Sequence, residues 1–208
     1  MKKVLILMLV PAMLMIAETN GQSGTDRKNV DLSKSKVLWT GSKPGGQHNG
    51  SVKLSSGHVI LNADKKISGG EFVIDMKSIV DYDLTTESMN KMLVDHLKSE
   101  DFFHVEKHPV AKFIIKEVAP LKNPEADNND FTGTHLIKGD LTIKNITKPI
   151  SFKAVIKIQD GNVSASTEKI ILDRTEWSVN YQSKKIFAEL KDKFIHDEME
   201  LSVLLETK

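Results

Sequence analysis

Residues 139–158, GDLTIKNITKPISFKAVIKI, have the pattern of two strands joined by a turn. Leu141 and Ile143 alternate with polar neighbours in its first half, and every second residue from Ile150 onward is apolar. Successive side chains of a strand point to opposite faces, so this period of two predicts strands with one apolar and one mostly polar face. The intervening NITK, residues 145–148, has the composition of a turn.

The same period of two recurs along the chain. Apolar residues alternate with mostly polar ones in three further sets: Phe72, Ile74 and Met76; Ala111, Phe113 and Ile115; Met199, Leu201, Val203 and Leu205. Turn-like sequences separate the segments, namely SSG at 55–57, ADKK at 63–66, NPEADNND at 123–130 and QDGN at 159–162. Eight or more strands joined mainly by short turns predict one all-β domain, an antiparallel meander that closes as a barrel or folds as a sandwich.

One segment departs from this period. Met89, Met92, Leu93, His96 and Leu97 recur at helical spacing and form one apolar stripe. Thr86 is placed to cap the start of this helix, with an acidic residue in the first turn. Phe102 and Phe103 follow in a loop. They either anchor the helix to the barrel or close one end of an apolar interior.

The N-terminus predicts export. Residues 1–17, MKKVLILMLVPAMLMIA, combine two lysines with an apolar run of secretory length that is too short for a comfortable membrane span. Cleavage after Gly21 leaves small residues at the required positions, with Ala17 as a second candidate and an uncleaved anchor as the competing interpretation. We therefore expect a signal peptide over 1–21, a loose N-terminus over 22–29, a barrel domain over 30–208, and a periplasmic or secreted protein.

The amino-acid composition limits the classes of partner and cofactor that we expect. The chain has no cysteine, so it is held together by its core, lacks the lipid attachment site of a lipoprotein, and has no thiol for catalysis or metal binding. A formal net charge of +1 gives no bulk attraction to nucleic acid, and aromatic residues at 6% supply a poor base-stacking surface. We expect no nucleic-acid partner, no stable membrane insertion of the mature chain and no dedicated cofactor beyond a bound lipid.

Catalytic and metal-binding patterns are weak. His104 and His108 have the spacing that a helix uses to present two metal ligands, but Pro109 disfavours helical geometry there. No nucleophile elbow or phosphate-binding glycine loop occurs. Asp81 and Asp83 lie in VDYDLTT, which is typical of a solvated turn before a helix. We expect a binding protein rather than an enzyme, with a metal-dependent hydrolase that uses His104 and His108 as the alternative.

Four motifs, in order, resemble the YceI-like family over about residues 30–206. They are HNGSVKL at 48–54, the run from Leu97-Lys98-Ser99 through Asp101-Phe102-Phe103 and Glu106-Lys107-x-Pro109 to Phe113, GDLTIKNITKPISF at 139–152, and DRTEWSVNY at 173–181. Two positions depart from the pattern: Asn145 replaces the usual turn glycine, and the late aromatic position is Trp177.

The resemblance implies an eight-stranded antiparallel barrel, similar to lipocalins, with a helix covering one end. Such proteins are typically periplasmic or secreted, and some carry a polyisoprenoid chain, such as a quinone tail, along the barrel. Others look able to bind fatty acids or amides. A ligand of this kind implies an apolar pocket without catalytic residues.

We therefore expect a binding protein that encloses a long apolar ligand, for lipid transport, storage or a stress response. The expected wall comprises Trp39, Phe72, Ile74, Met76, Phe113, Ile115, Leu141, Ile143, Phe152 and Trp177. Met89, Leu93, Phe102 and Phe103 form the expected lid, and His48 is a candidate contact for a polar head group. A filled barrel without ligand is the remaining alternative, since an eight-stranded barrel is about wide enough either for its own side chains or for one small ligand.

Overall fold

The computed structural model describes residues 25–122 and 131–208. The expected signal peptide at 1–21 and the turn at 123–130 lie outside the described residues. The elements in chain order are β1 (Asp26–Asn29), β2 (Lys36–Lys43), β3 (Gly46–Leu61), β4 (Ile67–Asp81), α1 (Glu87–Lys98), β5 (Val110–Pro120), β6 (His135–Ile143), β7 (Ile146–Gln159), β8 (Asn162–Thr167), β9 (Ile170–Asp173), the 3₁₀ turns η1 (Arg174–Trp177) and η2 (Ala188–Leu190), and β10 (Glu198–Glu206).

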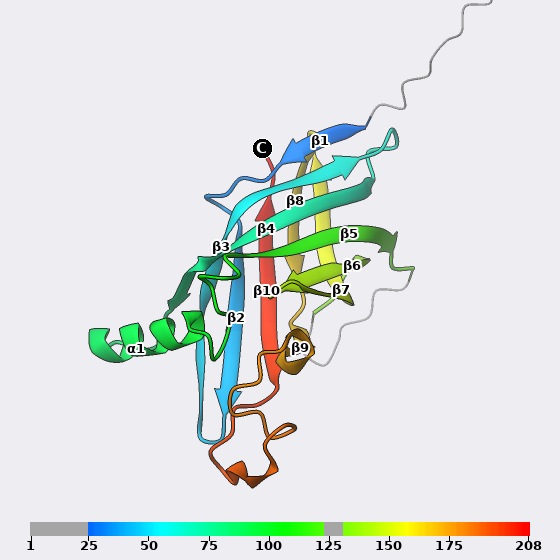
Figure 1. The fold of residues 1–208 in the computed structure, drawn as a ribbon. Helices are drawn as coiled ribbons and strands as arrows, with labels where there is room; N and C mark the ends of the chain where they lie inside the picture. Colours follow the sequence, from blue (N-terminus) through cyan, green and yellow to red (C-terminus); the bar gives the residue numbers. More distant parts are fainter. Residues whose placement is uncertain (1–24, 123–130) are drawn as a thin grey trace, which may run out of the picture.

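Eight of the strands close into an antiparallel barrel, which confirms the barrel and excludes the sandwich (Figure 1). The hydrogen-bonded order around the ring is β3-β2-β10-β8-β7-β6-β5-β4, and the pairing of β4 with β3 completes it. Within the described residues, no helix has the length and apolar character needed to cross a membrane.

Two short strands extend the ring where a neighbour ends. β1 pairs with the last residues of β3, beyond the region that β2 covers, and Val30 bridges to Thr207 after β10. β9 pairs with the first half of β10, and β8 pairs with its end. Residues 26–29 are therefore strand rather than the loose segment expected there. Their pairing satisfies backbone groups of β3 that would otherwise form an open edge.

Tight two-residue turns join several neighbouring strands. Lys144 and Asn145 have φ of 48° and 63° between β6 and β7, and Asp160 and Gly161 have φ of 52° and 76° between β7 and β8. Two consecutive left-handed residues match the twist of a hairpin, and asparagine tolerates that conformation better than most residues. The turn expected at 159–162 is confirmed. The turn expected at 145–148 lies earlier, at Lys144 and Asn145, and residues 146–148 already belong to β7.

The period of two predicts most of the inward faces. The expected turn at 55–57 is instead continuous strand within β3, where the pairing with β4 shifts register between Leu54 and Ser56. A bulge bends a strand without ending it. The residues at this bulge, Ser-Ser-Gly, have the composition of a turn. Ile158, near the end of β7, alternates correctly but remains 39% exposed.

Gly50 marks the closest approach between β3 and its neighbours. A Cβ atom at this position would lie 1.9 Å from the carbonyl oxygen of Val80 and 2.7 Å from the Trp39 ring. The backbones of β3 and β4 and the indole of β2 therefore meet at a site where only glycine fits.

We predict that Gly50→Ala lowers the free energy of unfolding by about 1–3 kcal/mol, since overpacking forces backbone shifts. Gly46→Ala is the matched control in the same strand, because a Cβ there meets nothing within 4 Å. Denaturant unfolding of both variants measures the difference. Equal stability of the two would contradict the close approach at Gly50.

Candidate ligand-binding cavity

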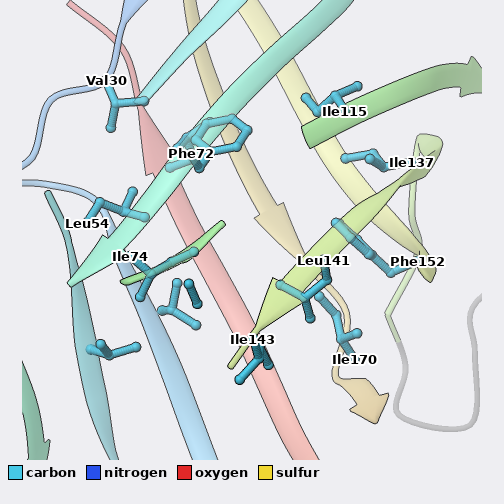
Figure 2. Close-up of a cluster of buried hydrophobic side chains, with 14 of the residues drawn as sticks. Val30, Leu54, Phe72, Ile74, Ile115, Ile137, Leu141, Ile143, Phe152 and Ile170 are labelled. Atoms are coloured by element: carbon cyan, nitrogen blue, oxygen red, sulfur yellow. The ribbon is translucent and has the colours of Figure 1, made fainter. Parts of the chain in front are cut away.

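An apolar cavity of about 230 Å³ lies inside the barrel. All eight barrel strands contribute to its wall, and nearly all lining side chains are aliphatic or aromatic. Figure 2 shows several of them converging on the interior from β3, β4, β5, β6, β7 and β9. The barrel is thus open rather than filled, a choice that the sequence did not resolve.

Nine of the ten expected wall residues line this cavity. They are Trp39, Phe72, Ile74, Met76, Phe113, Ile115, Leu141, Ile143 and Phe152. Further lining residues follow from the same period of two, including Met199, Leu201, Val203 and Leu205 of β10. The ring of Phe113 packs between those of Phe72 and Phe152, at centroid distances of 6.4 and 5.6 Å.

Trp177 is the exception, and its assignment to the wall is wrong. The residue is 1% exposed, but η1 carries it away from the cavity, and its indole N–H donates to the carbonyl of Leu141 at 3.2 Å. It lies beside residues of β7 and β9 around a separate, more polar depression. A 3₁₀ turn changes the direction of side chains, so strand periodicity does not extend through it.

The turn after α1 and the last turn of the helix line the cavity, whereas the rest of the helix does not. Phe102 and Phe103 both line the cavity, together with Leu97 in the last helical turn. Met89 is 49% exposed, Leu93 does not line the cavity, and α1 has no buried residue. Figure 1 shows the helix projecting to one side of the barrel. Met89 and Leu93 are therefore not part of the lid.

A second segment, which follows η1 and includes Ser178 and Tyr181, contacts this turn. The Tyr181 ring lies 5.4 Å from that of Phe102 and 4.6 Å from that of His96. The Lys144 ammonium, in the β6–β7 turn, donates to the carbonyls of Phe102 at 3.0 Å and Ser178 at 2.9 Å. Partial burial lowers the pKa of Lys144. One lysine thus ties both segments to the end of the barrel.

Arg174 organises the second segment, a role that the sequence did not predict. It lines the cavity and is only 4% exposed, and its guanidinium donates to the carbonyls of Val179, Ile195 and His196 and to Asp197. Burial lowers the pKa of Arg174, although Asp197 and Asp173 oppose this. Because its donors are engaged within the protein, Arg174 holds the segment in place rather than presenting a free charge.

His48 is not at the cavity, so a head-group contact there is not supported. Its Nδ1 lies 2.9 Å from Asp83 Oδ2, at the ends of β3 and β4 near α1. Asp81 is only 7% exposed, so the expected solvated turn is wrong at this position. Burial and the nearby Asp83 carboxylate raise the pKa of Asp81. Burial opposes a low pKa at Asp83, but hydrogen bonds from Asn49 and His48 outweigh it and lower that pKa.

His104 and His108 adjoin, with ring centroids 5.9 Å apart. Burial and the neighbouring Lys107 and His104 charges lower the pKa of His108. Within the part of the chain that the structure describes, the only group of three potential ligands close enough to share an ion is His48, Asp81 and Asp83. The histidine pair therefore has no third ligand there.

A closed antiparallel barrel around an apolar cavity, with a lid at one end, defines the lipocalin-like class of barrels. Two solved structures share this fold: Burkholderia cenocepacia BcnA, at 20% identity and a TM-score of 0.65 over 86% of this chain and 99% of that one, and a polyisoprenoid binding domain from Saccharophagus degradans, at 13% identity and a TM-score of 0.59 over 86% and 97%.

The particular family is shown by the sequence. The YceI-like domain model matches residues 29–207, and the chain belongs to that family. Relatives include a UPF0312 protein of Pseudomonas putida (strain W619), 33% identical over 47% of this chain and 50% of the relative, and one of Shewanella denitrificans, 32% identical over 41% and 44%. The chain spans about half the length of these curated relatives.

Lys144 offers a test of the two-segment lid. We predict that Lys144→Ala lowers the free energy of unfolding by about 1–3 kcal/mol, because two carbonyls lose a charged donor. Amide hydrogen exchange should accelerate at His104 and Val105, whose N–H groups bond within the lid turn.

Lys138→Ala is the control on the same hairpin. Lys138 forms only an exposed pair with Glu117, so the loss should be about 0–1 kcal/mol, with no change in lid exchange. Unchanged exchange at His104 in Lys144→Ala would show that Lys144 does not hold the lid.

Proposed function

We propose that this protein binds a long apolar molecule, a polyisoprenoid or a lipid of similar character, inside its barrel. The observation that carries the proposal is the apolar cavity, whose wall is continuous across all eight strands. The Saccharophagus degradans structure, which shares the fold, is described as a polyisoprenoid binding domain.

The composition of the wall favours recognition of a hydrocarbon chain over recognition of a polar head group. Its polar members are few: Thr40, Thr167, Arg174, His196 and Glu198. Arg174 is already bonded to protein carbonyls. The other polar members are spread over β2, β8 and residues 196–198, where β10 begins. Burial of each methylene contributes roughly 0.8 kcal/mol, so an extended hydrocarbon binds without a charged anchor.

The same features support binding rather than catalysis, in a periplasmic or secreted setting. The described wall residues are mainly aliphatic and aromatic, a composition that suits the binding of an apolar molecule. Residues 1–21 have the composition of a signal peptide, and export would bring a lipid carrier to a compartment where membranes and water meet. We propose transport or storage of the lipid as the role.

Native mass spectrometry of the exported protein tests this proposal. We expect a retained mass of several hundred daltons that extracts into hexane. Full-length chain expressed with its own leader should be compared with the same protein after organic extraction. Only apo protein, together with no uptake of an added polyisoprenoid, would contradict the proposal.

Ile143→Trp tests the location. Ile143 is 6% exposed and lines the cavity, so the larger ring should occupy the interior and reduce the retained ligand at least about tenfold. Ile114→Trp is the control on an outward face, where Ile114 is 38% exposed, and it should retain ligand normally. A folded Ile143→Trp protein with full ligand content would remove Ile143 from the binding site.

A further inference from the structure

A second cluster lies apart from the cavity, where β3 and β4 end beside the start of α1. His48, Asp81 and Asp83 each offer one ligand atom, and these atoms lie within 4.8 Å of one another. None of the three residues lines the cavity. The cluster is therefore independent of lipid binding.

Protein donors fix one oxygen of each carboxylate. Asp81 Oδ1 accepts from the Leu84 N–H at 2.9 Å and from the Asn90 side chain at 3.1 Å. Asp83 Oδ1 accepts from the Asn49 N–H at 2.8 Å. Asp83 Oδ2 pairs with His48 Nδ1 at 2.9 Å, whereas Asp81 Oδ2 remains for another partner. Donors that hold a ligand from behind in this way orient the ligands of metal sites.

The decisive atom is Asp81 Oδ2. This oxygen is buried and has no hydrogen-bond partner among the described residues. Asp81 as a whole is only 7% exposed. A carboxylate oxygen without a donor is costly in such surroundings, because the lost hydration is not replaced. The neighbouring Asp83 carboxylate is also an acceptor, so it satisfies this oxygen only when a proton lies between the two side chains. A metal cation in that position would replace the proton.

We propose that His48, Asp81 and Asp83 bind one divalent transition-metal ion, with Zn²⁺ as the reference ion. One imidazole nitrogen and two carboxylate oxygens form the kind of three-ligand set that leaves a fourth position of Zn²⁺ open. The imidazole disfavours Ca²⁺ and Mg²⁺, which prefer oxygen ligands. With metal–ligand distances of about 2.0–2.2 Å, His48 Nδ1 and Asp83 Oδ2, which lie 2.9 Å apart, would have to separate to admit the ion.

The site would join three parts of the chain. His48 comes from β3, Asp81 from the end of β4, and Asp83 from the segment that leads to α1, while Asn90 supports Asp81 from the helix itself. A bound ion would therefore attach the start of α1 to the barrel. The helix has no buried residue that could do this by packing.

The test is calorimetric titration of the purified full chain with ZnCl₂ after chelator treatment, with metal content measured in parallel. We expect one Zn²⁺ per chain and micromolar or tighter affinity. Asp81→Asn should weaken binding at least about 100-fold while the protein stays folded, because the amide removes the unpaired anion. Asn90→Ala should weaken it about 10–100-fold, as loss of a second-shell donor does.

His104→Ala is the matched control, because it removes a histidine from the other histidine-containing cluster and should leave the affinity unchanged. Three results would overturn the proposal: no stoichiometric Zn²⁺ binding, equal affinity in Asp81→Asn, or loss of binding in His104→Ala. Tighter binding of Ca²⁺ than of Zn²⁺ would overturn the assignment to a transition metal. Lipid retention is measured separately, so failure here does not affect the barrel proposal.

Discussion

The pairing of β3 with β4 is the constraint on which the rest of the molecule depends. It joins the first long strand to the strand at the other end of the sheet and so turns an open sheet into a barrel. Closure sends every second side chain of eight strands into one shared interior. It also requires the glycines at close approaches, the bulge near Ser56, and the short strands that cover the ends of longer neighbours.

The size of the side chains then decides whether that interior is filled. The inward positions are mostly aliphatic, with a few rings such as Phe72, Phe113 and Phe152, and they leave a cavity instead of meeting at the axis. Two irregular segments, the turn after α1 and the segment after η1, close one end of the cavity. Lys144 and Arg174 hold them in place by donating to their backbone carbonyls. A rigid wall with a lid held by a few polar contacts suits a ligand that must enter and leave.

Local patterns predicted the wall but not the positions that depend on long-range geometry. Alternation was sufficient to predict that Phe113 and Ile143 point into the barrel, because successive side chains of a strand point to opposite faces. It failed at Trp177, where a 3₁₀ turn intervenes, and at Met89 and Leu93, since an apolar stripe does not specify what the helix packs against. Asp81 resembled a solvated turn residue because its burial depends on His48 and Asn90, which reach it through strand register and helix placement.

We propose that the open interior of this YceI-like barrel holds a long apolar molecule. A crystal structure of the protein purified from its native compartment would show whether it does. We expect elongated density within the barrel, in contact with Phe103, Phe113 and Ile143. An interior closed by its own side chains, with no density and no cavity, would contradict it.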